Sequence, residues 1–244
     1  MLTIREDHSG GVLALPPLAP EVPGLSGQSP SGGREEDWQS RAQRVLKRVL
    51  DVALVLVGLP FALPLMGAIA VAVRVGSKGP ILFSQPQLGL RGRTIRPLKF
   101  RTMQEGAEAR LQELLAAGGP LAEEYRLFHK FKHDPRVTPI GRFLRKSSLD
   151  ELPQLFNVLW GDMSLVGPRP YLPREVEAMM GQGEAILQVP PGITGYWQVC
   201  GRNETTFQAR VTMDVHYVRH WSLALDLRLF LRTFWVVIRG QGAA

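Results

Sequence analysis

The chain has 244 residues, 45% of them hydrophobic, and a formal net charge of +7 at pH 7. A basic chain suits anionic partners, although charge alone does not distinguish a nucleotide, a nucleic acid or an anionic lipid. The single cysteine, Cys200, excludes an intramolecular disulfide and fits a reducing compartment. No local base pattern accompanies it, so a catalytic thiol is not indicated.

Residues 1–36 predict a disordered tail. The segment is rich in Gly, Pro and Ser and has no sustained apolar period, so it cannot offset the cost of ordering. It does not resemble a secretory signal, because Arg5 is followed by Glu6 and Asp7 and the apolar run 12–15 is too short.

Residues 37–78 predict a membrane-inserted hairpin. The stretch from Val52 to Val73 carries no charge, and as a helix it would extend about 33 Å, enough for a bilayer. Gly58, Pro60 and Pro64 lie in its middle, where proline bends a helix. Both flanks carry the basic residues typical of the cytoplasmic side, which a single span cannot satisfy. They are Arg41, Arg44, Lys47 and Arg48 before it, and Arg74, Lys78, Arg91, Arg93 and Arg96 after it. We therefore favour a re-entrant helix-break-helix, and a spanning helix is the alternative.

Residues 79–240 are long enough for one modest cytosolic domain, for which the pattern predicts a mixed α/β fold that is mostly helical. No Gly-rich phosphate-binding fingerprint follows a strand and opens a helix, so neither a Rossmann site nor a P-loop is indicated. Short strands are expected at 81–83 and 94–99, and helices at 103–117, 121–132, 152–159, 174–180 and 206–218.

Asp150 and Glu151 are adjacent carboxylates in a basic stretch. Ser148 with Glu151 three residues later fits a capping box, which needs no chemistry. Pro153 would then crowd the helix interior, so we expect the helix to begin near Pro153, with both carboxylates at or just before its N-terminus. An ionised carboxylate there can be a nucleophile or a magnesium ligand, and spacing alone leaves chemistry and capping equally open.

Cationic residues surround this pair. Arg169 stands between Pro168 and Pro170, which restrict the backbone on both sides, and a guanidinium held there offers a forked donor for phosphate. An isolated Pro-Arg-Pro would be only a surface turn. The further cations are Arg136, Arg142, Arg145 and Lys146 before the pair, and Lys99 and Arg101 upstream. Together they suit a diphosphate and its metal.

Two histidine pairs, His129 with His133 and His216 with His220, have the helix spacing of metal ligands. No Glu follows the first His of either pair, so neither is a zincin motif, and neighbouring cations would repel a dication. Magnesium held by a carboxylate and substrate phosphates is favoured over zinc.

The segment 227–238 predicts an amphipathic helix. Arg228 and Arg232 fall on one stripe, and Phe230, Phe234 and Trp235 cover much of the remainder. Periodicity leaves open whether this helix lies at a membrane interface with a Trp anchor or in a core with a thin solvated edge.

Several motifs occur in order along the chain. They are Lys47-Arg48-Val49-Leu50-Asp51, Gly79-Pro80-Ile81-Leu82-Phe83, Lys99-Phe100-Arg101-Thr102-Met103, the run from Ser148 to Pro170, the segment from Pro191 to Val199 with Gly201-Arg202-Asn203, Asp214-Val215-His216-Tyr217-Val218, and the segment from Trp221 to Leu227. In this order they resemble the bacterial sugar transferases, which are monotopic polyprenol-phosphate phosphoglycosyl transferases. The resemblance covers about residues 47–239, and it favours the re-entrant hairpin and the interfacial helix.

The resemblance implies a phosphotransferase that moves a sugar-1-phosphate from a UDP-sugar to undecaprenyl phosphate. It places this reaction on the cytoplasmic face of the bacterial inner membrane, with release of UMP, as the start of exopolysaccharide or related glycan assembly. It makes Asp150 the nucleophile, through a phosphosugar-aspartyl intermediate, and a ligand of Mg²⁺. Glu151 would assist by proton handling or metal positioning. The residues that the resemblance implies for phosphate or substrate binding are Lys99, Arg101, Arg145, Pro168, Arg169, Pro170 and Arg202.

The partners that this resemblance implies are a UDP-sugar, undecaprenyl phosphate and membrane lipids, with no nucleic acid, and a homodimer is left open. The chain is similar to the short form of the family, without the extra N-terminal membrane module. Gly195-Tyr196-Trp197-Gln198 leans toward hexose-1-phosphate transferases of the exopolysaccharide type, whereas Leu59 stands where many members have Ser. Two other classes remain open: a glycosyltransferase that releases UDP, and a non-enzymatic, membrane-attached basic module.

Overall fold

The structure is a computed structural model that describes residues 41–128, 131, 133–200 and 205–239. These residues belong to one compact unit that begins at Glu36. The tail predicted for residues 1–36 lies outside the described residues.

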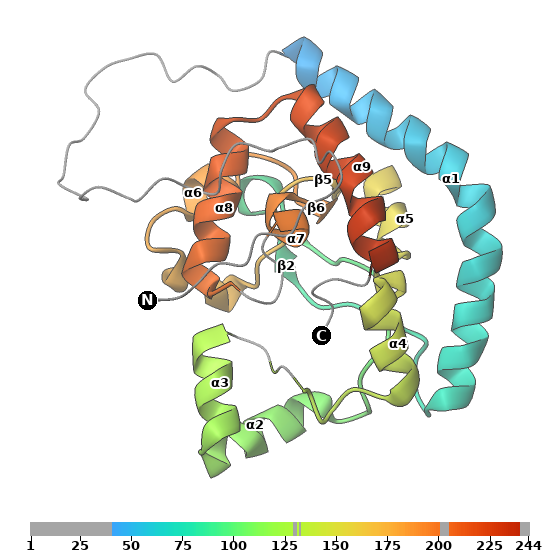
Figure 1. The fold of residues 1–244 in the computed structure, drawn as a ribbon, viewed down its shortest axis with the longest axis vertical. Helices are drawn as coiled ribbons and strands as arrows, with labels where there is room; N and C mark the ends of the chain where they lie inside the picture. Colours follow the sequence, from blue (N-terminus) through green and yellow to red (C-terminus); the bar gives the residue numbers. More distant parts are fainter. Residues whose placement is uncertain (1–40, 129–130, 132, 201–204, 240–244) are drawn as a thin grey trace, which may run out of the picture. The chain divides into compact units, whose positions relative to one another are not determined.

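The first helix, α1, spans Arg41–Gly76 as one continuous helix, and it is the one described helix that is long and apolar enough to cross a membrane. Pro60 and Pro64 lie inside it without ending it, and Figure 1 shows the helix bending along its length. The break expected between two helices is therefore a bend within one. The middle of α1 exposes large apolar side chains such as Val57 and Phe61.

The remainder is mostly helical, as predicted, with short strands between the helices. The helices are α2 (Ala107–Ala117), α3 (Pro120–Phe128), α4 (Pro139–Ser147), α5 (Gln154–Trp160), α6 (Gly183–Ile186), α7 (Tyr196–Cys200), α8 (Phe207–Arg219) and α9 (Leu223–Arg239). The 3-10 turns are η1 (Leu90–Gly92), η2 (Leu149–Glu151), η3 (Pro173–Glu175) and η4 (Glu177–Met179). The strands are β1 (Leu82–Phe83), β2 (Gln87–Leu88), β3 (Thr94–Ile95), β4 (Lys99–Phe100), β5 (Ser164–Val166) and β6 (Gly192–Thr194).

The strands form three separate pairs. β1 with β4 and β2 with β3 are antiparallel, whereas β5 and β6 are parallel, with Val166 opposite Thr194. Beyond β5 the two backbones come so close that a Cβ on Gly167 would lie 2.5 Å from the carbonyl oxygen of Pro190. Glycine is therefore required where β5 runs into the Pro168–Pro170 segment.

Three elements differ from those that the sequence predicts. The strand expected over 94–99 is two strands, β3 and β4, with Pro97 between them, where no amide hydrogen is available for a ladder. The helix expected from Met103 begins at Ala107, after Gly106 in the left-handed conformation. The helix expected over 174–180 is instead the two turns η3 and η4, which end at Met180, also left-handed.

Two other helices follow simple capping rules. Thr206 caps α8 by accepting from the amide of Ala209, in agreement with the expected start. Helix α4 was not predicted, although Thr138 caps it and Pro139 opens it, a recognisable start signal. Basic residues that precede the carboxylate pair thus lie on a helix.

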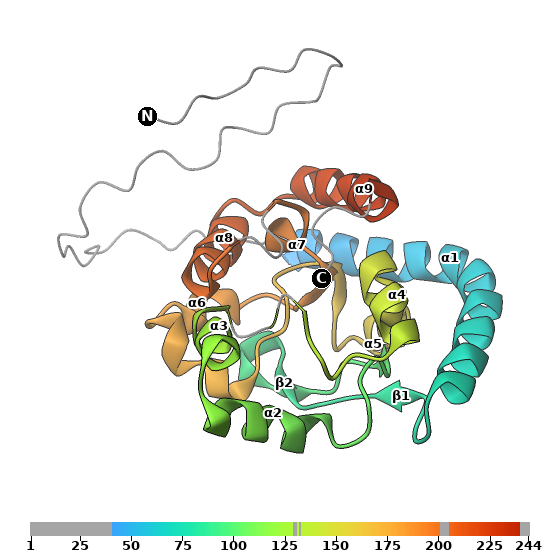
Figure 2. The same cartoon turned by 60° about the horizontal axis from the view of Figure 1, so that its bottom comes forward.

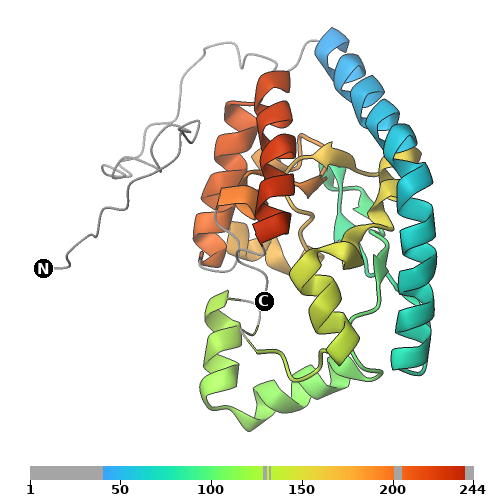
Figure 3. The same ribbon diagram turned by 45° about the vertical axis from the view of Figure 1, so that its right-hand side comes forward.

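Both ends of α1 pack against the same globular unit, and Figure 3 shows the helix running along one side of it. Val55 joins the largest core cluster, which includes Val158 and Tyr217. Nearer the C-terminal end of α1, Val73 joins a second cluster with Leu144 of α4. Helix α9 lies beside the first half of α1 (Figure 2).

Candidate active site

The two carboxylates lie in the tight turn η2 between α4 and α5. Ser148, at φ 57°, ends α4, and its side chain makes no capping hydrogen bond to the turn that follows. The capping-box interpretation is therefore wrong. Helix α5 begins at Gln154, directly after Pro153, as the proline argument predicted. The turn directs the two neighbouring side chains into different surroundings.

Glu151 joins two cations from distant parts of the chain. Its Oε1 accepts from Lys99 Nζ at 2.6 Å and lies 3.0 Å from a guanidinium nitrogen of Arg169. Burial alone would raise the pKa of Glu151, but Arg169 and Lys99 outweigh burial and lower it to about 2. Glu151 therefore stays ionised and holds β4 and the segment after β5 together.

Asp150 is in the opposite situation. It is 9% exposed, and no residue in the described part of the chain donates a hydrogen bond to it. Burial, followed by the charge of Glu151, raises its pKa to about 6, although Lys99, Arg145 and Arg169 act in the other direction. Asp150 is thus an ionised carboxylate at neutral pH with unshared lone pairs and cations nearby.

The structure brings together some of the predicted cations and not others. Lys99, Arg145 and Arg169 act electrostatically on Asp150, and Arg145 is oriented by donating to Thr102 Oγ1 at 2.9 Å. Arg101 instead donates to the backbone and side chain of Ser77, at 2.9 and 2.8 Å. Arg101, which follows strand β4, therefore supports the residue after α1, whereas Lys99 contacts the carboxylate of Glu151.

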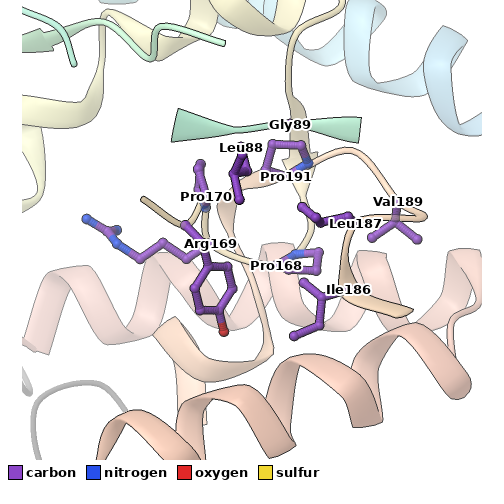
Figure 4. Close-up of a pocket in the computed structure, with 10 residues that line it drawn as sticks. Leu88, Gly89, Pro168, Arg169, Pro170, Ile186, Leu187, Val189 and Pro191 are labelled. Atoms are coloured by element: carbon purple, nitrogen blue, oxygen red, sulfur yellow. The ribbon is translucent and has the colours of Figure 1, made fainter. Parts of the chain in front are cut away.

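The Pro168–Pro170 segment has an inner and an outer side. In Figure 4 both prolines line a small apolar pocket with Leu187, and the Arg169 side chain points away from it. The Pro168 carbonyl also accepts from the amide of Gly192 at 2.8 Å. The two prolines, predicted as binding residues, thus lie against the protein and fix the direction of Arg169.

A second polar cluster behind this segment was missed by sequence reasoning. The guanidinium of Arg210 lies 3.9 Å from the ring centre of Tyr171 and donates to the Arg169 carbonyl at 3.3 Å. The Tyr171 hydroxyl donates to Asp214 at 2.7 Å, and burial raises the pKa of the fully buried Asp214 to about 6. We call Tyr171, Arg210 and Asp214 the loop-support cluster. An opposite charge pair four residues apart on α8 was its sequence signal.

The carboxylate of Asp150 is the protein ligand that the site would provide for a metal ion. No group of three or more His, Cys, Asp or Glu residues in the described ranges could hold a metal ion by itself. His216 and His220 stack 4.2 Å apart, while His129 and Arg202 lie outside the described residues. Asp150 suits Mg²⁺ if substrate phosphates supply the other ligands, because its oxygens have no donor of their own.

The fold and the site define a membrane-associated enzyme with a carboxylate among cations, suited to phosphate chemistry. Residues 42–240 match the family model described as bacterial sugar transferase, and the chain belongs to this family. The predicted resemblance is confirmed.

Three relatives illustrate the range of the family. The chain is 40% identical over 199 residues to the exopolysaccharide production protein ExoY of Sinorhizobium fredii, a match covering 82% of this chain and 88% of the relative. It is 42% identical over 209 residues to the undecaprenyl-phosphate galactose phosphotransferase of Salmonella typhimurium, covering 86% and 44%. It is 37% identical over 204 residues to the UDP-glucose:undecaprenyl-phosphate glucose-1-phosphate transferase of Escherichia coli, covering 80% and 41%. The chain thus spans less than half the length of the last two.

Proposed function

We propose that this chain transfers a sugar-1-phosphate, of a hexose type, from a UDP-sugar to undecaprenyl phosphate and releases UMP. The names of the Salmonella and Escherichia coli relatives supply the substrate class, and the Sinorhizobium relative points to exopolysaccharide assembly. The observation that carries the chemistry is the difference between Asp150, which has no hydrogen-bond donor among the described residues, and Glu151, which is held by two cations.

The reaction divides into two displacements at one phosphorus atom. An Asp150 oxygen attacks the sugar-proximal phosphorus, and the bond from that phosphorus to the UMP oxygen breaks, leaving its electron pair with UMP. An oxygen of the lipid phosphate then attacks the same phosphorus, and the bond to Asp150 breaks, which restores the carboxylate. Both the leaving group and the acceptor are phosphates, so neither step requires a general acid or base.

This proton-free scheme suits the surroundings of Glu151. A carboxylate with a pKa of about 2 is a poor proton carrier at neutral pH, so Glu151 acts by aligning Lys99 and Arg169. Arg169, whose side chain is 31% exposed, and Lys99 would then stabilise the charge on the transferred phosphoryl group. Mg²⁺, when held by Asp150 and the diphosphate, would neutralise further phosphate charge.

The membrane topology is proposed on geometry. Lys47 near the start of α1 and Val73 near its end both contact the same globular unit, which supports an arrangement with both ends of α1 on one side of a membrane. We infer that α1 enters the cytoplasmic face of the inner membrane and returns to it, with the exposed α1 residues Val57 and Phe61 among the lipids. The exposed apolar residues Leu231, Phe234 and Trp235 of α9 suit the interface.

The deciding experiment uses the purified full chain with UDP-sugars and no lipid acceptor. We expect release of up to one equivalent of UMP and a hexose phosphate adduct on the peptide that contains Asp150, measured by mass spectrometry. Release of UDP would establish a glycosyltransferase instead, and no nucleotide release with or without undecaprenyl phosphate would favour a binding module. UMP release that requires the lipid acceptor, without any adduct, would contradict the covalent route.

Two further measurements test the metal and the topology. EDTA should abolish turnover and added Mg²⁺ should restore it, whereas full activity in EDTA would contradict the metal requirement. Cysteines placed at Arg41 and Lys78, with Cys200 replaced, should both be protected from an impermeant thiol reagent in intact cells. Labelling at one position from outside would establish a spanning helix.

A further inference from the structure

We propose that Lys47 is a positioning residue for the active site, and that the first turns of α1 align the segments that carry Glu151 and Arg169. The inference rests on the proposed function and assigns an internal task to residues that the sequence places beside the membrane. Lys47 and Asp51 are each only 7% exposed, although they belong to the basic-flanked start of the apolar helix.

Lys47 acts on the strand that leads to Arg169. Its Nζ donates to the carbonyl oxygen of Val166, the last residue of β5, at 3.0 Å. The same Nζ forms an ion pair with Asp226 of α9 at 2.5 Å. Asp226 also accepts from the hydroxyl of Tyr217 at 2.7 Å and from the indole nitrogen of Trp221 at 3.1 Å, so three donors stabilise its negative charge. The charge of Lys47 therefore pairs with a buried carboxylate of the protein and does not face the membrane surface.

Asp51, one turn further along α1, holds the beginning of the same strand. Its carboxylate accepts from the Ser164 hydroxyl at 2.7 Å and from the Leu165 amide at 3.3 Å. On the opposite edge β5 pairs with β6. The strand is thus fixed between α1 and β6 only three residues before Arg169.

Arg48 holds the helix that follows the carboxylate turn. Its guanidinium donates to the carbonyl oxygens of Val158 and Leu159, the latter at 2.9 Å, near the C-terminal end of α5. Such carbonyls have no partner within the helix, so a guanidinium there stabilises the end. Helix α5 begins three residues after Glu151, at Gln154.

These contacts form a closed arrangement. Side chains of α1 bind both α5 and β5. The residues just before α5 and just after β5 are joined to each other by the ion pair between Glu151 and Arg169, at 3.0 Å. A shift of about 1 Å at reacting groups can lower a rate by about 10²-fold. Because the contacts of α1 fix β5, and β5 leads to Arg169, these contacts affect catalysis through the position of Arg169.

The test replaces both charges of the buried pair. Lys47→Met alone would leave Asp226 as a buried anion without its cation, so we combine it with Asp226→Asn, which keeps the shape and the oxygen that accepts from Tyr217. We expect kcat for UMP release with undecaprenyl phosphate to fall by at least about tenfold, while the melting temperature and membrane association stay close to wild type. Arg41→Gln, which removes one positive charge from the exposed start of the same helix, should leave kcat unchanged.

A second arm asks whether the effect passes through Arg169. In an Arg169→Lys background, the pair of substitutions at 47 and 226 should lower kcat by less than about threefold, because the geometry that it disturbs is already lost. Full additivity of the losses would overturn the proposal, and so would wild-type kcat in Lys47→Met with Asp226→Asn.

A milder variant tests the proposal even if the double variant does not fold. If the double variant is unstable, Ser164→Ala removes only the hydroxyl that joins Asp51 to β5, and we expect kcat to fall by about twofold to fivefold. Unchanged kcat in Ser164→Ala would overturn the proposal. The proposed function is checked separately by wild-type UMP release, so its failure is distinguishable from failure of this inference.

Discussion

Asp150 and Asp214 both lie near the Pro168–Tyr171 segment and share several properties. Each is buried, each lies near an arginine, and the pKa of each is raised to about 6. Asp214 is 0% exposed and accepts from Tyr171, whereas Asp150 keeps 9% exposure and has no donor within the described residues. A raised pKa therefore reports burial, and the accessible oxygens without a donor are what distinguish Asp150, the proposed nucleophile, from Asp214.

The arginines differ in the same way. Arg210 lies against the rings of Tyr171 and Trp197, 3.9 and 5.0 Å from their centres, and its donors serve backbone carbonyls. Arg169 is 31% exposed in its side chain and shares Glu151 with Lys99. The loop-support cluster holds the backbone, whereas Arg169 and Lys99, which stay partly exposed beside Glu151, can bind a charged substrate.

The largest effect is expected from removing the free carboxylate. Asp150→Asn should lower UMP release at least about 10³-fold, because an amide is a poor nucleophile and the covalent route is lost. Asp214→Asn removes the same charge from the buried cluster and should stay within about tenfold of wild type. Equal losses in initial-rate assays would show that the two aspartates are not functionally distinct.

The next largest effect is expected at Arg169. Arg169→Ala should lower kcat by about 10²- to 10³-fold, the range for loss of one transition-state donor, and Arg169→Lys should recover only part. Arg174→Ala is the matched control, since the Arg174 side chain is 58% exposed and lies on η3. Steady-state kinetics showing equal loss in both alanine variants would argue against a special place for Arg169.

A smaller, graded effect is expected from pH. Asp150 must be ionised to attack, so the rate of adduct formation should fall about tenfold per pH unit below about 6. Glu151→Gln should move this midpoint to lower pH, because the charge of Glu151 raises the pKa of Asp150. A midpoint that stays at the same pH in the Gln variant would contradict the assigned cause.

The smallest effect concerns stability. An ionised carboxylate with a folded-state pKa of about 6 against the ordinary 3.8 costs the folded state about 3 kcal/mol. This cost develops as pH rises from 3.8 to 6 and is constant above that range. Asp150→Asn should therefore raise the free energy of unfolding by about 1–3 kcal/mol at pH 7.5 and by much less at pH 4, as measured by denaturant titration.

Local chemistry made several features of the fold predictable. Pro153 fixed the start of α5, Thr206 marked the start of α8, and the uncharged stretch 52–73 predicted a long apolar helix. The α-helix expected over 174–180 is wrong because the segment forms two 3-10 turns, η3 and η4, and ends at the left-handed Met180, and nothing in its apolar spacing indicates this.

The sequence by itself determined the family, the apolar helix with its basic ends, and the meeting of carboxylates and cations near one helix start. It could not determine which carboxylate is free, because the partners of Glu151 lie 52 and 18 positions away, at Lys99 and Arg169. It also could not show that Lys47 faces Asp226, 179 positions away. Hydrogen bonds and burial set the role of each charge, and both depend on side chains that meet only when the chain has folded.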